Sequence, residues 1–516
     1  MILLFNTCTI VRERRIKMKN NKSLKIYNET NRKLTAYNTL IAATYFDKDT
    51  VAPKKGNRRR NEALSLMSGE VYSIETDKDY LDAIEDLRKQ DRGFENDREI
   101  YLRCKALEDV LKFTKKETMA YTQAIMNSSD SWMKAREHKD YRYFEKDLHR
   151  LIEMTKERLK RIDNKRHPYD VLLDNYQEGM NREKYDAFFD RIREELIPLI
   201  REVSSRQQMV DDSFLHRYYP ASKQREFAKI LLKYLHFDPS WGYMGESEHP
   251  YTTSICEDDI RITTRYMEHD LSAAIFSIIH ETGHAYYDHQ VDRKYQNTMI
   301  KDAISMGVHE SQSRFNENYI GKRRSFWVKL YPELVRIFPE NLKDVSLDQF
   351  ITAINRSCPS FIRTEADELT YPIHILIRYE IEKAIFDNSI DLKDLPKIWN
   401  QKYKEYLGLD VRNDYEGILQ DIHWSQASFG YFPTYALGSA IGAQLIDKME
   451  KEMDVDALLE KGKYALVQKW LKEKIQKYGA LYTYDDLLKL ATGKKFSPDH
   501  YIRYLKNKYR KLYKIR

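Results

Sequence analysis

Two histidines stand four residues apart in the segment His280-Glu281-Thr282-Gly283-His284. In a helix of ~3.6 residues per turn this spacing places both imidazoles on one face, where they can share a divalent ion at ~2.0–2.1 Å. Glu281 then lies beside the ion's position, free to handle a proton. The pattern predicts a metal centre with a general base beside it, which is typical of metal-assisted hydrolysis.

A catalytic metal site of this kind needs a third protein ligand and an open position for water. Glu310, in the segment His309-Glu-Ser-Gln-Ser-Arg, follows His284 by 26 residues, which is enough chain for a loop and a second helix. A chance match to the two-histidine pattern would not require such a residue. We therefore predict His280, His284 and Glu310 as the metal ligands.

The segment around the two histidines has the features of a helix. Asp270 is a reasonable N-cap, because its carboxylate can accept from the first free backbone N–H groups. Leu271, Ala274, Ile275 and Ile278 then recur at the spacing of one buried helical face. The metal ligands are accordingly expected on a helix that is anchored in the core.

Composition predicts the surrounding fold class. Glycine and proline together number 30 (17 and 13) of 516 residues, and 32% of the residues are charged. Few helix breakers and many charges favour long amphipathic helices over a β-sandwich or barrel. With 42% hydrophobic residues the chain can bury a sizeable core. We predict a mainly α fold, with one large helical domain around a deep substrate groove.

Periodicity and turn signals divide the chain further. Residues 1–17 are interpreted as a possible N-terminal extension, and 18–516 as one catalytic domain without internal repeats. The segment 167–180 is expected to be an interhelix loop, and 249–266 a small β-hairpin whose exposed edge could align a peptide backbone beside the metal. Helices are predicted over 24–43, 57–76, 77–91, 94–128, 130–164, 181–206, 221–235, 323–337, 347–356, 365–387, 393–407, 433–452, 455–460, 464–478, 484–491 and 498–514.

Charge and cysteine content bear on the partners and the cellular compartment to be expected for the protein. The net charge is +7, and charges of both signs are interspersed. Basic runs at 58–60 and 506–516 lie in no recognisable nucleic-acid-binding motif, so no nucleic-acid partner is expected. The four cysteines have no metal-ligand or disulfide spacing, which favours a reducing cytoplasmic setting. The apolar run 271–279 is too short to span a bilayer, so no membrane association is expected.

A second break among the C-terminal helices spans residues 417–438. It combines His423, Trp424, Tyr431 and Tyr435 with glycine and proline. Such a composition indicates a shaped loop that carries function. The alternative is an aromatic loop that only packs on the core.

These segments together resemble the thermostable carboxypeptidases typified by carboxypeptidase Taq, metallopeptidase family M32. The similarity runs from about residue 25 to the C-terminus. The matching motifs are His249-Pro-Tyr (HPF in the family), Asp259-Ile-Arg-Ile-Thr (DxRxT), the 280–284 segment (HExxH), 309–314 (HESQSR), and Gln420-Asp-Ile-His-Trp with Gly430-Tyr-Phe-Pro-Thr-Tyr. Also similar are 169–174 and 366–371.

The resemblance implies a nearly all-helical fold with a deep groove, usually a homodimer, and a zinc or cobalt ion. It implies an enzyme that removes single C-terminal residues from peptide substrates with broad specificity. Besides Tyr251 in the HPF motif, two positions depart from the family pattern. Phe46 and Asn316 each stand where the family has tryptophan, and neither is a predicted ligand.

Within this interpretation each remaining residue has an expected role. Glu281 is the general base, and His423 with Tyr435 or Tyr431 donates to the oxyanion from a loop that the family places over the site. Arg363 is expected to bind the substrate carboxylate through its planar fork, unless it pairs with Glu365 or Asp367. His249 is expected to line the same end of the groove, and Arg261 to hold the hairpin.

Two alternatives stay open on sequence grounds. A helical oligopeptidase or peptidyl-dipeptidase can share the two-histidine pattern and a downstream glutamate. A non-catalytic helical scaffold with a structural metal site is the other. The ligand types also leave the ion open among zinc, cobalt and other divalent metals.

Overall fold

The computed structural model describes the backbone of residues 2–516, and the side chains of residues 22–516 apart from residue 109. The helices are α1 (Ile2–Thr50), α2 (Asn57–Glu75), α3 (Lys78–Arg88), α4 (Phe94–Leu111), α5 (Lys115–His138), α6 (Arg142–Ile162), α7 (Pro168–Tyr176), α8 (Arg182–Ser204), α9 (Ala221–Tyr234), α10 (Leu271–Gln290), α11 (Met306–Arg314), α12 (Arg324–Ile337), α13 (Pro339–Leu342), α14 (Leu347–Ile354), α15 (Tyr371–Phe386), α16 (Leu395–Leu407), α17 (Pro433–Glu452), α18 (Val455–Glu460), α19 (Tyr464–Lys474), α20 (Tyr484–Thr492) and α21 (Asp499–Leu512). The strands are β1 (Gly242–Glu246), β2 (Thr252–Cys256) and β3 (Asp259–Thr264).

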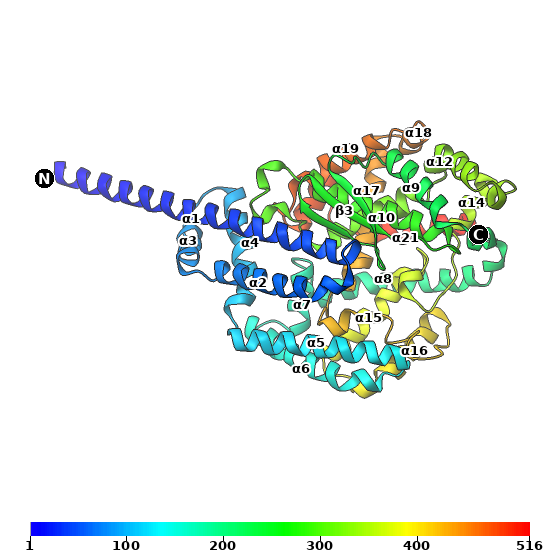
Figure 1. Ribbon diagram of the computed structural model, residues 1–516, viewed down its shortest axis with the longest axis horizontal. Coiled ribbons are helices and arrows are strands. Elements are labelled where there is room, and N and C mark those ends of the chain that lie inside the picture. The colour runs from blue at the N-terminus through cyan, green and yellow to red at the C-terminus, as the bar shows by residue number, and fades with distance from the viewer. Residues whose placement is uncertain (1) are drawn as a thin grey trace.

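The predicted mainly α fold is confirmed, with one small sheet beside the helix that carries the two histidines. Helices α1 and α2 pack together on one side of the sheet, and α5 with α6 form a second pair farther along the molecule (Figure 1). Helix α11 contacts both α10 and α17. The predicted metal ligands therefore lie in the interior of the helical body.

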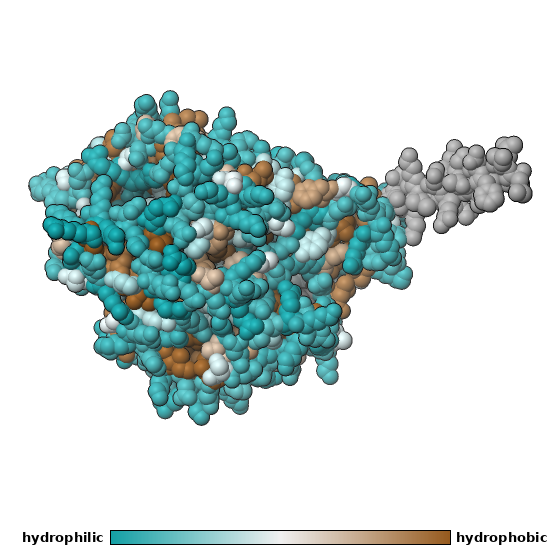
Figure 2. Space-filling model, turned by 180° about the vertical axis from the view of Figure 1, so that it is seen from behind, coloured by the Kyte–Doolittle hydropathy of each residue, from teal (hydrophilic) through white to brown (hydrophobic). Residues whose placement is uncertain are grey.

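The described core consists of one large cluster of buried hydrophobic side chains and three small ones. The large cluster extends from Trp132 to Ile515 and includes the buried face of α10. One small cluster joins α1, α3 and α4 through residues such as Tyr27, Tyr80 and Leu107. Hydrophilic residues cover most of the rear face of the molecule, and hydrophobic residues appear there as separate patches (Figure 2).

The sheet confirms the predicted hairpin and adds a strand to it. β2 and β3 pair antiparallel around the turn at 257–258, and β1 pairs with β3 in parallel, so the order is β1-β3-β2. β1 was not predicted, because its sequence Gly-Tyr-Met-Gly-Glu contains two glycines and no β-branched residue. β2 is therefore an edge strand, and its first residue, Thr252, lies against α10.

Several of the predicted elements were wrong. The first helix continues beyond residue 43 to Thr50, and α15 begins at Tyr371 and not at 365. The predicted helix 94–128 is broken after Leu111, because Thr114 and Glu117 form a capping box that starts α5. The predicted helix 130–164 is broken at Lys139, which adopts a left-handed backbone with φ of 54°. The segment 167–180 is not a plain loop, because Pro168 at the first helical position starts α7.

Candidate active site

Helix α10 carries the two histidines as predicted. The Asp270 carboxylate caps it by accepting from the backbone N–H groups of Ser272 and Ala273. The rings of His280 and His284 project from the same face, with centroids 5.1 Å apart. Ile278 and Ile279 on the opposite face are buried in the large core cluster, which fixes the direction in which the imidazoles point.

Glu310 on α11 meets the two histidines. Its Oε2 lies 3.4 Å from His284 Nε2 and 3.8 Å from His280 Nε2. One ligand atom from each of the three residues lies within 4.8 Å of the others. Three ligands bound to a tetrahedral ion at ~2.1 Å are roughly 3.4 Å apart, so this donor set fits a divalent ion after only small movements.

Two glycines allow the helices to come this close. A Cβ on Gly283 would lie 2.4 Å from the carbonyl oxygen of Gln312 on α11. A Cβ on Gly438 of α17 would lie 2.7 Å from Cγ of Glu310. The position after Thr282 in the two-histidine segment is therefore more than a spacer, because only glycine lets α11 present its glutamate to α10.

A largely buried carboxylate fixes the orientation of the imidazole of His280, one of the predicted metal ligands. Glu317 Oε2 lies 2.8 Å from Nδ1 of His280, which leaves Nε2 free to bind an ion. Arg314 bridges the two glutamates, with Nε 2.7 Å from Glu310 and Nη1 3.1 Å from Glu317. Burial raises the pKa of Glu317, but Arg314 and His280 outweigh it and hold that pKa at about 2.

Sequence reasoning missed Glu317 and Arg314. Arg314 follows Glu310 by four residues and Glu317 follows it by seven, so all three lie on one helical face. That spacing was the available signal. The helix widens into a π-helical segment at Phe315–Gly321, so Glu317 lies in irregular geometry that sequence periodicity does not reveal.

Glu281 has the environment that a general base requires. It is only 6% exposed, and its Oε2 accepts a hydrogen bond of 2.6 Å from the Thr252 hydroxyl on β2. Burial raises the pKa of its carboxyl. A raised pKa brings a carboxylate closer to the proton affinity that base catalysis near neutral pH needs.

His423 and the two tyrosines gather beside the ligands. His423 Nε2 lies 3.2 Å from the Tyr435 hydroxyl, and the rings of Tyr431 and Tyr435 are 5.1 Å apart. Burial and the nearby arginines lower the pKa of His423 to about 4, so its ring is neutral at pH 7. Glu310 is close enough to raise the pKa values of both tyrosines, although burial is the larger cause.

The loop that carries these residues is anchored by Glu382 of α15. Its Oε1 accepts from Trp424 Nε1 at 2.7 Å, and its Oε2 accepts from Tyr169 Oη and the Gly430 backbone N–H, both at 2.8 Å. Burial raises the pKa of Glu382 to about 7, against the three donors that lower it. A single carboxylate thus holds the loop at two points, Trp424 and Gly430.

Arg363 is buried and ion-paired. Its Nε and Nη2 both lie 2.9 Å from Asp421 Oδ1, and its Nη1 lies 3.2 Å from the Tyr371 hydroxyl. The alternative partners expected from the sequence, Glu365 and Asp367, were wrong. The guanidinium lies 5.0 Å from the ring centroid of Tyr435, which brings it next to the group of His423 and Tyr431.

The structure separates His249 from this group. It lies in the exposed connection between β1 and β2, where its carbonyl oxygen accepts from the Ser247 hydroxyl. Among the described residues, no hydrogen bond or ring contact joins its imidazole to the metal ligands. Arg261 pairs with Asp259 at 2.6 and 2.7 Å and covers Phe46, which confirms its predicted role in holding the hairpin.

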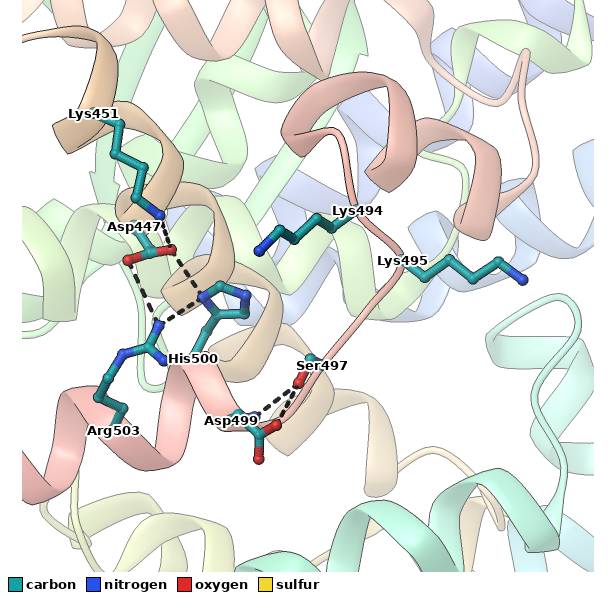
Figure 3. A pocket seen from close by; sticks show the side chains of 8 residues that line it. All are labelled: Asp447, Lys451, Lys494, Lys495, Ser497, Asp499, His500 and Arg503. Carbon is teal, nitrogen blue, oxygen red and sulfur yellow. Dashed lines mark hydrogen bonds and ion pairs between the residues drawn. The ribbon is translucent and has the colours of Figure 1, made fainter.

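A second polar hollow, of about 500 Å³, lies between α17 and α21 (Figure 3). Asp447 pairs there with Lys451 at 2.7 Å, His500 at 3.0 Å and Arg503 at 3.6 Å. The side chain of Lys495 points away from this group. The predicted metal ligands and the predicted general base do not line this hollow; they lie on α10 and α11.

Comparisons with known proteins agree with this geometry. The sequence profile described as carboxypeptidase Taq (M32) metallopeptidase matches residues 26–509. The chain belongs to this family. It is therefore a metallocarboxypeptidase, and the family implies a divalent metal.

Relatives of the M32 enzyme match along nearly their whole length. Carboxypeptidase 1 of Bacillus subtilis is 40% identical over 486 residues, which cover 93% of this chain and 97% of the relative. Thermostable carboxypeptidase 1 of Thermus thermophilus is 34% identical, with coverage of 93% and 97%. The M32 carboxypeptidase structure from Deinococcus radiodurans superposes with a TM-score of 0.92 at 27% identity, covering 95% of this chain and 99% of that one.

The two departures of this carboxypeptidase from the family pattern affect packing. Phe46 is 3% exposed and makes edge contacts with Tyr243 and Tyr251. Asn316 is buried and accepts a hydrogen bond of 3.0 Å from Gln468. No helix in the described part of the chain is long and apolar enough to cross a membrane.

Proposed function

We propose that this metallocarboxypeptidase releases single C-terminal residues with broad specificity, using zinc held by His280, His284 and Glu310. The observation that supports this most directly is the convergence of two imidazoles and one carboxylate on a common point, with Glu281 beside them. Cobalt or another divalent ion would suit the same donors. When bound, such an ion polarises the scissile carbonyl and acidifies a water molecule.

The chain's own residues would carry the proton transfers. Glu281 accepts the proton from the attacking water and passes it to the nitrogen of the leaving amino acid. The Thr252 hydroxyl, 2.6 Å from Oε2, keeps the carboxylate turned toward β2. His423 and Tyr435, with Tyr431 beside them, donate to the oxygen that becomes negative in the tetrahedral state.

Terminal carboxylate recognition is assigned to Arg363. Among the described residues its Nη1 hydrogen-bonds to the Tyr371 hydroxyl alone, and we assign this side of the fork, next to Tyr435, to the substrate carboxylate. Asp421 offsets part of its charge, which limits the strength of the interaction. His249 is proposed to line the groove on the side of Thr252 opposite to Cys256, at the end that holds the released residue.

Two variants test the metal centre. Glu281→Gln should lose at least a hundredfold in kcat, the usual contribution of a general base at ~10²–10⁴-fold, while it keeps the bound metal. Glu310→Ala should lose the metal in elemental analysis. Near-normal hydrolysis by Glu281→Gln, or full metal occupancy in Glu310→Ala, would contradict the assignment.

Peptides blocked at either end test the exopeptidase reaction. An N-acetylated peptide should be shortened by one residue at a time in mass spectrometry, and its C-terminal amide should resist. Release of dipeptides would indicate a peptidyl-dipeptidase. For Arg363→Lys, the expected result is a raised KM together with lower thermal stability, because lysine does not reproduce the two contacts with Asp421; an unchanged KM with lower stability would make Arg363 structural.

We also propose a homodimer in the cytoplasm as the working state, on the family resemblance and the cysteine usage. Cys104, Cys256 and Cys358 are free thiols. Sedimentation at micromolar concentration distinguishes a dimer of 61.8 kDa chains from a monomer.

A further inference from the structure

A cavity of about 660 Å³ opens beside the candidate active site. His309 forms part of its wall, and the His309 ring stacks on the metal ligand His284 with centroids 4.3 Å apart. The other walls come from α1, α4, α7, β2 and the segment between α10 and α11. The cavity therefore begins next to the metal ligands and extends away from them.

The size of the cavity indicates which part of a substrate it takes. An enzyme that releases one residue has only that residue beyond the scissile bond, so the rest of the peptide must lie upstream. A volume of about 660 Å³ is that of a site for several residues. On the proposed function, on which this inference rests, the cavity is the upstream part of the groove.

The direction of β2 agrees with this assignment. Thr252 at its start contacts Glu281, whereas Ser254, Ile255 and Cys256 line the cavity. A peptide that adds antiparallel to an edge strand runs opposite to it. Its scissile bond near Thr252 would then place its upstream residues beside Cys256, within the cavity.

The charges in the cavity are unbalanced. Asp174, Glu178 and Asp288 are compensated by Lys105, Arg98 and His309 respectively. Three further carboxylates, those of Glu257, Asp292 and Asp302, form no ion pair among the described side chains. Arg293 acts on Glu257, and Lys301 with Arg103 acts on Asp302, at distances longer than an ion pair, so these charges are offset in part. The lining as a whole holds six carboxylates and two lysines, and is therefore net acidic.

We propose that Glu257, Asp292 and Asp302 make the upstream groove selective for substrates with a cationic group two to four residues before the scissile bond. The cation is a lysine or arginine side chain, or the free α-ammonium group of a short peptide. These carboxylates lie upstream of the scissile bond, so the preference for the side chain of the released amino acid is not affected. Peptides with acidic residues at the same positions are the disfavoured class.

The test uses N-acetylated hexapeptides of alanine ending in leucine, with Lys, Ala or Glu at the fourth, third or second position before the released leucine. For the metal-loaded enzyme at low salt, kcat/KM should be roughly tenfold higher with Lys than with Glu at the best position, as expected for several weak pairs acting together. The ratio should fall in ~1 M salt, where the Debye length is ~3 Å. Equal rates for Lys and Glu would overturn the proposal.

A triple variant locates the effect. Glu257→Gln with Asp292→Asn and Asp302→Asn should reduce the Lys-to-Glu ratio to about twofold or less, with the all-alanine peptide hydrolysed as before. The matched control is Glu183→Gln with Glu340→Gln and Asp344→Asn, which removes three exposed carboxylates outside the cavity. A ratio that survives in the first variant, or that falls equally in the control, would contradict the assignment.

Two arms separate this inference from the proposed function. Unacetylated Ala-Ala-Ala-Leu carries its α-ammonium group on the third residue before the released leucine. Compared with its acetylated form, it reports whether this group is the cation; a gain that the triple variant removes supports that source. The mass of the product from the all-alanine peptide reports the reaction itself. Release of dipeptides would overturn the exopeptidase function, whereas loss of the charge preference alone would overturn only the groove assignment.

Discussion

At the scale of single residues, Glu317 and Arg314 position two of the predicted metal ligands, His280 and Glu310. Nδ1 of His280 is bound by Glu317, whereas Nδ1 of His284 is buried and has no hydrogen-bond partner among the described residues. The two histidines are therefore supported unequally. His284 depends on the stacked ring of His309, which in turn is fixed by Asp288 at 3.0 Å.

Glu317→Gln should weaken metal binding about 10- to 100-fold, the usual effect of removing a carboxylate that orients a ligand histidine. The neutral amide no longer stabilises the His280 tautomer or compensates Arg314. Competition with a chelator of known affinity measures the change. Glu340→Gln, on exposed α13, should leave the affinity unchanged; an unchanged affinity in Glu317→Gln would show that Glu317 does not orient the ligand.

At the scale of elements, the contact between α11 and α17 determines whether Glu310 reaches its position. Gly438 and Gly442 face Glu310 and Tyr319, and a Cβ at Gly442 would lie 2.7 Å from the Tyr319 ring. The helices thus pack at a distance that side chains would forbid. The loop before α17 is held from α15, because the Glu382 carboxylate accepts hydrogen bonds from Trp424 and Gly430.

Gly438→Ala should lower the free energy of unfolding by about 1–3 kcal/mol, because the added methyl group overpacks against Glu310. It should also reduce metal occupancy. Urea denaturation and elemental analysis measure the two effects. Gly69→Ala on α2, where a Cβ meets nothing within 4 Å, should instead be neutral or stabilising.

Glu382 should make stability depend on pH. Its pKa is raised from 4.5 to about 7 in the folded protein, so the folded state binds the proton more tightly than the unfolded chain. Its contribution is then fully present below pH 4.5 and is lost as pH rises through 7, by about 3 kcal/mol.

The Glu382→Gln variant isolates this contribution, because glutamine carries no titrating proton. Urea denaturation of the metal-free proteins from pH 4.5 to 7.5 should show the wild type losing stability relative to the variant as pH rises. A difference between the two proteins that stays constant over that range would show that Glu382 titrates normally.

The sequence predicts those elements whose signals are local, and it does not predict those that depend on tertiary contacts. Two histidines, a glutamate and a cap are local signals, so α10 and the convergence of His280, His284 and Glu310 could be predicted. Glu382 lies 41 residues before His423 and carries no motif, and only tertiary contact reveals its role. The breaks at Thr114 and Lys139 depend on side-chain caps and a left-handed residue, which leave hydrophobic periodicity almost unchanged.

At the scale of the whole molecule, the metal centre depends on packing that extends to the last helix. α21 contacts α17 and α8 and buries Tyr501, Ile502, Leu505 and Tyr509. Two of its basic residues form ion pairs, Lys506 with Glu195 of α8 and Lys508 with Glu368 in the turn before α15. The C-terminal basic run therefore stabilises the helical body and supports α17 behind Glu310.

Leu505→Ala should cost about 2–5 kcal/mol of unfolding free energy, because Leu505 is fully buried and the cavity cannot collapse completely. Urea denaturation measures the loss. Leu490→Ala on α20, where the side chain is 51% exposed, is the matched control and should cost far less. Equal losses in the two variants would indicate that α21 is only loosely packed.

The ligands on α10 and α11 have a consequence for the intervening chain. A bound ion would tie His284 to Glu310 and so close a loop of 26 residues that crosses the wall of the substrate groove. Closing a loop removes configurational freedom from the open forms of the chain. Amide hydrogens at 291–305 should therefore exchange with deuterium more slowly when metal is present, and chelation should make this segment the first to accept protease cleavage.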